Sequence, residues 1–420
     1  MAQPAPLAVL PLTNVLRSLM TTTVSSSPFL LRPSLAIMSV LANTANPVLN
    51  PDKNPILRFF LKKTFYAQFC AGENAPEVQR TIDSLKRIGF SGVILCYAKE
   101  VVLTEVQTKG LASCDSGAAA QECVRTEINP WAAGTMETVL LTPPGDFVAV
   151  KFTGAGRQAL HALSQRLPPS EALASAIDRI CELASSRGVR LLFDAEQQAL
   201  QPGIDDWSLE YMRKYNTSDT AVIYGTYQVY LKAAPAILSR HLAAAQKDGF
   251  LLGVKLVRGA YLGTDPRHLI HETKADTDVA YDGVTEALLR RQWNAQLQPH
   301  GEGSETAVPT VSLVLATHNR DSVLKAQALL SETKSGIDVA YAQLQGMADE
   351  VSCELVTGNG AGGKPGTYKY LVWGSTGECM KYLLRRAYEN RDAVQRTRDG
   401  RNAMRTELMR RFKSIFGFTQ

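Results

Sequence analysis

The chain has 420 residues, of which 45% are apolar and 20% are charged, so it can form one large globular domain or two ordinary ones. Its net charge of +5 is matched by residues 396–420 alone, where seven Arg and Lys stand against two acidic residues. The rest of the chain is therefore close to neutral, which argues against a general nucleic-acid-binding face.

The cysteines and histidines indicate neither a disulfide framework nor a metal centre. The seven Cys are scattered, with no CxxC motif and no paired metal-ligand spacing, which favours a reducing compartment. His268 and His271 are three residues apart, but no cluster of Cys or carboxylates accompanies them. We therefore predict no metal site.

Two interpretations of the N-terminus stay open. Residues 1–51 contain no acidic residue and are rich in Ser, Thr and Ala, a composition typical of an organelle transit peptide. Alternatively, "VLRSLM" and "SLAIMSVLA" are core helices that begin a helical arm over residues 1–91. No stretch reaches the roughly 18 consecutive apolar residues of a membrane span.

Residues 76–90 have the apolar spacing of a helix that Gly89 would end. From there, helical stretches alternate with apolar, β-branched runs. We predict helices over 170–188, 227–249, 282–297 and 320–334. We predict strands over Gly92–Tyr97, Phe147–Phe152, Arg190–Asp194, Ala221–Tyr224, Leu251–Val257, Val311–Thr317, Asp338–Gln343 and Tyr368–Trp373.

Eight strands that alternate with helices predict an α/β fold, a distorted (βα)8 TIM-type barrel over residues 92–395, with an open doubly wound sheet as the alternative. Residues 106–136 show no clear period and are interpreted as an inserted loop. Residues 396–420 form a basic C-terminal helix. It is either an amphipathic element that binds membrane surfaces or, as we favour, a final packing helix.

Polar residues lie at or near the carboxyl end of nearly every predicted strand, where barrel enzymes carry their catalytic groups. They are Lys151, Asp194, Tyr224 with Gln228, Lys255 with Arg258, Thr317 with His318 and Asn319, Gln343, and Tyr370. Taken singly, Asp194, His318 and Asn319 can also be capping or turn residues. A lysine inside an apolar strand is rarely buried unless it is paired, so Lys151 and Lys255 favour a functional interpretation.

A helix predicted over residues 377–390 follows the last strand. At 100° per residue, Tyr382, Arg385, Arg386 and Glu389 share one face, and an apolar face lies opposite. Adjacent guanidinium groups are suited to bidentate binding of a carboxylate or phosphate. The alternative is an ordinary solvated helix face with a weak Arg–Glu ion pair.

Seven stretches together resemble the proline dehydrogenase (proline oxidase) family, in its eukaryotic, mitochondrial, fungal-like branch. They occur in the family's order between about residues 60 and 394, and the chain departs from the pattern at "YLVWG", near Val372. The stretches are "FYAQFCAGE", "LLFDAE", "TYQVYL", "VKLVRGAYL", "ATHN", "QLQGMAD" and "YLLRRAYEN".

The resemblance implies an FAD enzyme that oxidises L-proline to Δ1-pyrroline-5-carboxylate by hydride transfer to flavin N5. Electrons would then pass to a membrane quinone, in a mitochondrial protein peripheral to the inner membrane. By motif position, Asp194 and Lys255 match catalytic residues, and Glu389 a structural ion-pair residue. Substrate-binding positions fall on Lys151, Arg385, Arg386, Tyr370, Tyr382, Leu256 and Tyr261. FAD-binding positions fall on Gln228, Lys255, Arg258, Gly259, Ala260, Thr317, His318 and Asn319.

Three other functions remain open at this point. Hydroxyproline can replace proline as the substrate within the same family. A flavin-free barrel lyase would use Lys151 or Lys255 as a Schiff-base amine. A non-enzymatic module would bind through its basic tail. If FAD is the partner of the two cations of the fifth strand, Lys255 and Arg258 should lack a full set of protein partners without it.

Overall fold

The computed structural model describes residues 5–44, 46–99, 117–301, 307–333, 336–358, 365–392 and 394–415. Eight strands close a barrel in chain order, which confirms the predicted (βα)8 barrel and excludes the open sheet. The strands are β1 (Gly92–Tyr97), β2 (Phe147–Val150), β3 (Arg190–Phe193), β4 (Ile223–Gln228), β5 (Leu252–Val257), β6 (Val311–Ala316), β7 (Asp338–Leu344) and β8 (Gly366–Trp373).

Most of the strands are buried along their whole length, as parallel strands covered by helices on the outside must be. This burial explains why they stand out as apolar runs in the sequence. The prediction is wrong for β4, which runs through to Gln228. Tyr224 is therefore near the start of its strand, where its hydroxyl lies 2.7 Å from Ser312 Oγ. The helix expected from residue 227 begins only at Ala234.

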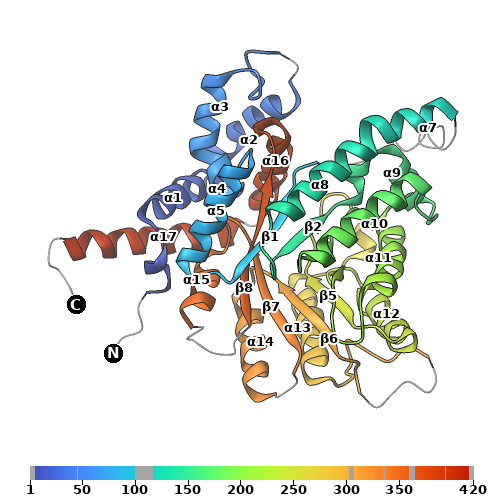
Figure 1. Ribbon diagram of the computed structural model, residues 1–420. Helices are drawn as coiled ribbons and strands as arrows, with labels where there is room; N and C mark the ends of the chain where they lie inside the picture. The colour runs from blue at the N-terminus through green and yellow to red at the C-terminus, as the bar shows by residue number, and fades with distance from the viewer. Residues whose placement is uncertain are drawn as a thin grey trace. The chain divides into compact units, whose positions relative to one another are not determined.

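The chain divides into two compact units, which we call the central unit (Ile94–Ala342) and the terminal unit (Met1–Val93 with Gln343–Gln420). The domain boundaries predicted at residues 91 and 395 separate the eight barrel strands from the helices before and after them. They differ from this division into units and remain a prediction. Helices of the central unit are α7 (Gly117–Cys123), α8 (Asn129–Leu141), α9 (Arg157–Ser164), α10 (Glu171–Ser186), α11 (Gln201–Tyr215), α12 (Ala234–Asp248), α13 (Lys274–Arg290) and α14 (Arg320–Glu332) (Figure 1).

The inserted loop predicted over residues 106–136 is wrong for its described part, which is helical from Gly117 onwards through α7, a π-helical turn and α8. Helix α8 buries Trp131 and Val139. The many small residues and threonines of this segment hide the helical period in the sequence, because few large apolar side chains mark its buried face. Residues 106–116 lie outside the described part of the chain.

The terminal unit is mainly helical. Its helices are α1 (Leu12–Ser26), α2 (Pro28–Asn43), α3 (Pro55–Leu61), α4 (Ala67–Phe69), α5 (Ala75–Ile88), α15 (Asp349–Gly358), α16 (Thr376–Asp392) and α17 (Val394–Ile415). The stretches "VLRSLM" and "SLAIMSVLA" lie inside α1 and α2, so their predicted helical structure is confirmed. No single helix within the described residues is long and apolar enough to cross a membrane. Helices α1 and α2 pass that test only as a pair, and they meet at a bend of 98°.

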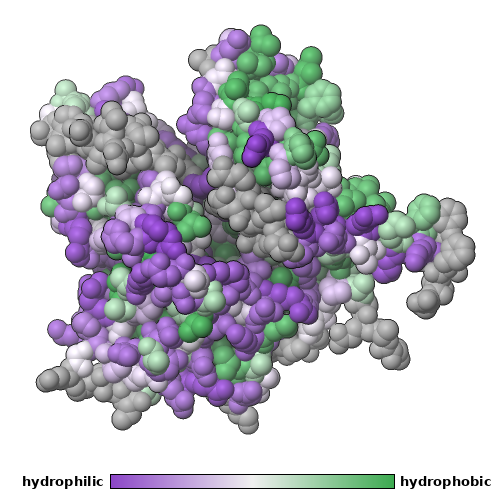
Figure 2. Space-filling model, turned by 180° about the vertical axis from the view of Figure 1, so that it is seen from behind, coloured by the Kyte–Doolittle hydropathy of each residue, from purple (hydrophilic) through white to green (hydrophobic). Residues whose placement is uncertain are grey.

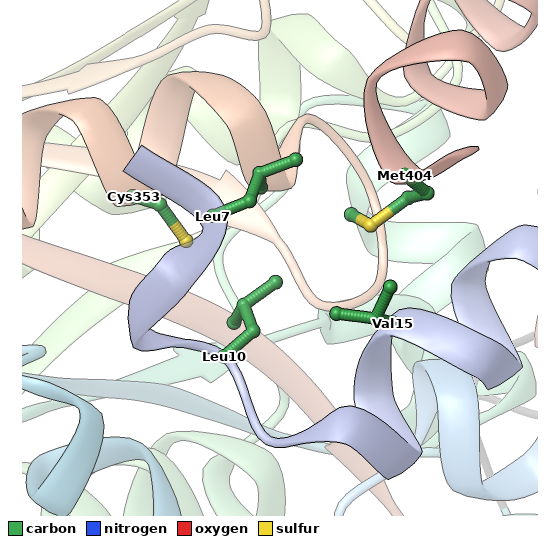
Figure 3. Packing of buried hydrophobic residues seen from close by; sticks show 5 residues of the cluster. All are labelled: Leu7, Leu10, Val15, Cys353 and Met404. Atoms are coloured by element: carbon green, nitrogen blue, oxygen red, sulfur yellow. The ribbon is translucent and has the colours of Figure 1, made fainter. Parts of the chain in front are cut away.

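The C-terminal helix α17 packs against the N-terminal segment. Leu7, Leu10 and Val15 form a buried cluster with Cys353 and Met404 (Figure 3). Helices α1 and α17 also lie along each other within this unit (Figure 1). The favoured interpretation of residues 396–420 as a packing helix is therefore confirmed for the part up to Ile415.

Glu73 joins α3 and the turn after it to the start of α16. Its carboxylate accepts hydrogen bonds from Thr376 N at 2.9 Å and Thr376 Oγ1 at 2.6 Å. Lys62 Nζ lies 2.6 Å away and Arg58 Nη2 2.8 Å away. Burial alone would raise the pKa of Glu73, but hydrogen bonds from Lys62, Thr376 and Arg58 outweigh it and lower the pKa to about 2.

Glu73→Gln is expected to lower the free energy of unfolding by about 1–3 kcal/mol near neutral pH, because the donors around it lose an anion. The folded-state pKa lies below the unfolded value of about 4.3. The carboxylate therefore stabilises the fold above that value, and this contribution is lost as the pH falls towards about 2.

Denaturant titrations at about pH 7 and about pH 3 check this prediction. The difference between wild type and Glu73→Gln should shrink at the lower pH. Glu332→Gln, which removes an exposed carboxylate 2.9 Å from Arg290, is the matched control and should change stability little at either pH. A Glu73→Gln effect that is independent of pH would contradict the assignment.

Candidate active site

Three residues predicted from strand ends meet in the central unit. Asp194 follows β3, and its Oδ1 accepts a hydrogen bond from Lys255 Nζ of β5 at 2.6 Å. Asp194 Oδ2 lies 3.2 Å from Nζ of Lys151, which follows β2. The side chains of Lys255 and Asp194 are only 7% and 6% exposed. The capping role considered for Asp194 is therefore replaced by a buried triad with two cations and one anion.

Lys151 is held in place through its backbone. Its carbonyl accepts a hydrogen bond from Trp131 Nε1 at 3.0 Å. The 3-10 turn Phe152–Ala155 follows, and the backbone N–H of Thr153 donates to Glu196 Oε1 at 3.1 Å. Glu196 lies two residues after Asp194, so it joins the segment that carries Lys151 to the segment that carries the aspartate.

Lys255 occupies an interior position of β5, opposite Thr226 of β4 and Val314 of β6. Neighbouring residues of a strand point to opposite faces, so Leu256 faces away from Lys255. The side chain of Leu256 is completely buried. Its predicted contact with substrate stays a prediction.

Each guanidinium nitrogen of Arg258 has a protein partner. Its Nη1 donates to Asp278 Oδ1, its Nη2 to Ser322 Oγ at 2.7 Å and its Nε to Thr317 Oγ1 at 3.2 Å. Lys255 likewise has the carboxylate of Asp194. Helix α13 and the start of α14 bring Asp278 and Ser322 to this strand end. The expectation that Lys255 and Arg258 lack a full set of protein partners, one for every N–H group, stays a prediction.

Asp278 was not among the predicted site residues, although it pairs with Arg258 and also lies 2.6 Å from Lys274 Nζ. Burial alone would raise the pKa of Asp278, but Lys274 and Arg258 outweigh it, so the pKa lies below its ordinary value. Arg258 also lies over the ring of Tyr281, with 4.9 Å between its guanidinium carbon and the ring centre. The sequence pattern of α13 did not distinguish Asp278 from the other acidic residues of that helix.

The loop after β5 is held close to the preceding strand. Ala260 N donates to Gln228 Oε1 at 3.2 Å, and Gln228 Nε2 donates to Glu196 O at 3.3 Å. Gly259 and Ala260 are exposed, and Tyr261 is half-buried. A Cβ on Gly259 would lie 2.3 Å from the ring of Tyr230, so packing inside the protein already requires glycine there.

The "ATHN" residues after β6 include a helix cap, Asn319, and a hydrogen-bond partner of Arg258, Thr317. Asn319 is the N-cap of α14: its Oδ1 accepts hydrogen bonds from Asp321 N at 3.0 Å and Ser322 N at 3.3 Å. The capping alternative is therefore confirmed for Asn319. Thr317 is buried against Arg258, and His318 is half-buried beside it.

The donor groups of this region fit FAD. Lys255, Arg258 and the amide of Gln228 offer cations and N–H donors, which suit the carbonyl oxygens of a flavin and an anionic diphosphate. The exposed backbone of Gly259 and Ala260 adjoins them and presents little side-chain bulk. The two carboxylates among these residues, Asp194 and Asp278, each have two cations close by.

The remaining predicted residues belong to the terminal unit. Tyr370 lies in β8, and Tyr382, Arg385 and Arg386 lie in α16. Arg386 is 6% exposed, and the guanidinium carbons of Arg386 and Arg385 lie 5.2 and 6.0 Å from the ring centre of Tyr382. The predicted common face of this helix is thus confirmed for three of its residues. The side chain of Glu389 lies outside the described part of the structure, so its predicted ion pair stays a prediction.

A second lysine inside a strand was missed. Lys369 of β8 is almost completely buried, and its Nζ lies 2.8 Å from Asp349 Oδ1 and 3.1 Å from the carbonyl of Met347. The signal that identified Lys255, a cation within an apolar run, is also present in "YKYLVW". The same signal therefore marks a lysine in the triad with Asp194 and a lysine in a separate buried ion pair with Asp349.

A small pocket of about 40 Å3 lies elsewhere in the terminal unit, and the residues that line it include Ser18, Phe69, Met347 and Thr397. Across the described ranges, no three His, Cys, Asp or Glu side chains gather as metal ligands would.

Known proteins resemble this chain over most of its length. Residues 78–399 match the family model described as proline dehydrogenase. A probable mitochondrial proline dehydrogenase of Schizosaccharomyces pombe is 30% identical, and the alignment covers 95% of this chain and 88% of that protein. A hydroxyproline dehydrogenase of Xenopus laevis is 29% identical over 84% of this chain and 78% of its own length.

Two further comparisons involve longer proteins. A mitochondrial proline dehydrogenase 1 of Dictyostelium discoideum is 28% identical, and the match spans 63% of its length. The crystal structure of proline utilization A from Bdellovibrio bacteriovorus aligns with a TM-score of 0.65 at 16% identity, over 89% of this chain and 38% of that one. At this identity the structural likeness shows the fold alone.

Proposed function

Because the chain belongs to the proline dehydrogenase family, we propose that it oxidises L-proline to Δ1-pyrroline-5-carboxylate with FAD as its cofactor. The observation that carries the proposal is the buried triad of Lys151, Asp194 and Lys255. Two ammonium groups around one carboxylate leave a net positive site, which suits a carboxylate substrate and an electron-rich cofactor. FAD, when bound, accepts the hydride that leaves the proline ring.

The side chains of this protein would bind and orient the substrate. Lys151, Arg385 and Arg386 would hold the proline carboxylate, since guanidinium groups bind carboxylates through paired hydrogen bonds. Asp194 would hold Lys151 and Lys255 in place. Tyr370, Tyr382, Leu256 and Tyr261 would surround the ring and keep water away from it. Binding by the carboxylate leaves the ring carbon next to nitrogen free to react.

A second set would hold the cofactor. It consists of Gln228, Lys255, Arg258, Gly259, Ala260, Thr317, His318 and Asn319. Positive side chains near a flavin stabilise its anionic reduced form, which favours hydride transfer away from the substrate. Asn319 also caps α14, so we propose that it supports FAD binding by fixing the position of this loop as well as by direct contact with FAD.

Hydroxyproline is the alternative substrate. The Xenopus laevis relative named hydroxyproline dehydrogenase is as similar to this chain as several of the proline dehydrogenases are. The two substrates differ by one hydroxyl group, so the residues that surround the ring would decide between them. We favour proline because the relative with 30% identity and the widest coverage carries that name.

The Schiff-base lyase is disfavoured. A Schiff base needs an amine that is free to attack a carbonyl carbon. The Nζ atoms of Lys151 and Lys255 lie 3.2 Å and 2.6 Å from the Asp194 carboxylate, which engages both amines.

We propose a membrane quinone as the electron acceptor and a mitochondrial location peripheral to the inner membrane, in a fungal-like branch of the family. The mitochondrial location is supported by the names of relatives from Schizosaccharomyces pombe and Dictyostelium discoideum, both described as mitochondrial. The quinone and the inner membrane rest on the family resemblance alone.

The visible absorption spectrum of the purified protein tests the cofactor and the substrate together. We expect a yellow protein whose flavin absorption is bleached by L-proline under anaerobic conditions, and bleached more slowly by trans-4-hydroxy-L-proline. Faster bleaching by hydroxyproline would establish the alternative substrate. A colourless protein that does not take up added FAD would contradict the proposed function.

A further inference from the structure

Helix α2 is apolar on both of its sides. Its inner face, which includes Leu31 and Leu35, is buried, and the helix packs with α1 and α16 of its own unit. Phe29, Ile37 and Val40 lie within an arc of about 80° on the other side. They are 90%, 61% and 53% exposed. A helix that is hydrophobic all round is normally surrounded by apolar material.

Helix α3 continues the pattern. Ile56, Phe59 and Phe60 have the i, i+3, i+4 spacing of one helix face, and each is more than half exposed. We call these residues, together with Phe29, Ile37 and Val40, the α2–α3 apolar surface. Figure 2 shows hydrophobic side chains gathered over the part of the molecule that these helices form. Exposed apolar residues that cluster in this way mark interaction sites.

The charges beside the α2–α3 apolar surface are mainly positive. Arg32, Lys53 and Lys63 are exposed, and Lys63 Nζ lies 5.9 Å from the ring centre of Phe59. No acidic residue precedes Asp52 in the chain. The Asp52 carboxylate accepts a hydrogen bond from Gly377 N at 2.8 Å, so it is engaged at the start of α16.

We propose that the α2–α3 apolar surface binds an anionic lipid bilayer, with both helices lying in the headgroup region. Exposed aromatic and aliphatic side chains with Lys and Arg at their edge are typical of interfacial helices. Each basic residue close to an anionic leaflet adds to the attraction.

A second copy of the chain fits this surface less well. A twofold interface places each patch against its own copy, so Arg32, Lys53 and Lys63 would face like charges. The helix α17 is also a weaker candidate for lipid contact, because Met404 is buried and Leu408 packs on the same internal cluster. The inference rests on the proposed function only in that the bilayer would also supply the quinone.

Co-sedimentation of the full-length protein with vesicles tests the proposal. The vesicles contain phosphatidylcholine alone or phosphatidylcholine with phosphatidylglycerol. We expect binding to the anionic vesicles, and roughly tenfold or greater loss of partitioning in a Phe59→Ser, Phe60→Ser double variant, since two apolar side chains would no longer enter the lipid. The control is Phe412→Ser with Ile415→Ser on α17, which are 57% and 78% exposed and so at least as accessible as Phe59 and Phe60, at 57% and 62%.

The outcomes separate the alternatives. Equal vesicle binding by wild type and the α3 variant, or a loss confined to the α17 variant, would overturn the proposal. So would a dimer of the wild-type protein in lipid-free gel filtration that dissociates in the α3 variant, because the surface would then bind a second copy. Proline oxidation with a water-soluble acceptor is measured without lipid on the same samples. If none of these samples oxidises proline, the proposed function is refuted, and the result on vesicle binding still stands.

Discussion

Asp194→Ala is expected to abolish proline-dependent flavin reduction and to lower the free energy of unfolding by about 3–5 kcal/mol. The variant leaves the ammonium groups of Lys151 and Lys255 buried without the carboxylate that lies within 3.2 Å of both. Denaturant unfolding and anaerobic flavin reduction measure the two effects. Asp206→Ala, which removes an exposed carboxylate 2.8 Å from Arg166, should cost less than about 1 kcal/mol and keep activity.

A double variant separates the stabilising role of Asp194 from its catalytic one. Asp194→Asn combined with Lys255→Met removes one cation along with the anion, so much of the lost stability should return. Activity should not return, because the proposed site needs both groups. An Asp194→Ala variant that is as stable and as active as wild type would disprove the importance of the triad.

Arg385→Met or Arg386→Met is expected to raise the KM for proline by about thirtyfold or more, because a buried charge pair with the substrate carboxylate is worth about 2–5 kcal/mol. The FAD content should change little. Arg386 is the more buried of the two and should show the larger effect. Steady-state kinetics measure the KM for proline, and the flavin-to-protein ratio of each variant measures its FAD content.

Variants on the same helix provide the controls for the two arginines. Lys381→Met removes an exposed cation of α16 and should leave proline kinetics unchanged. Arg386→Lys keeps the charge but not the paired hydrogen bonds, so it should recover only part of the affinity. Unchanged proline kinetics in both Arg→Met variants would refute the assignment of a carboxylate clamp.

Most strands of this fold could be located from the sequence because they are largely buried apolar runs, as in β5 and β6. The end of β4 was missed where polar residues enter the strand: Thr226 and Gln228 are buried, so the apolar run stops before the strand does. Helix α8 was missed because small residues and threonines leave too few large apolar side chains to show a period.

The sequence predicted which residues belong to the candidate site, but it did not predict which of them contact one another. Strand ends indicated that Lys151, Asp194 and Lys255 share a rim, but the sequence did not say that one carboxylate bridges both lysines. Lys255 and Asp194 are 61 residues apart, and their contact depends on closure of the barrel. Asp278 was unpredictable because an acid on an exposed helix is ordinary until a strand end places Arg258 beside it.

The partners of Arg258 make this residue a preorganised cation. Thr317, Asp278 and Ser322 hold its guanidinium group, so the rotamer entropy of the side chain, roughly 2 kcal/mol, is lost on folding and not on binding. A ligand that contacts Arg258 therefore associates with a smaller entropic penalty. Asp278 also offsets part of the positive charge of Arg258. Substitutions on α13 can therefore change the affinity for an anionic ligand although α13 itself does not contact that ligand.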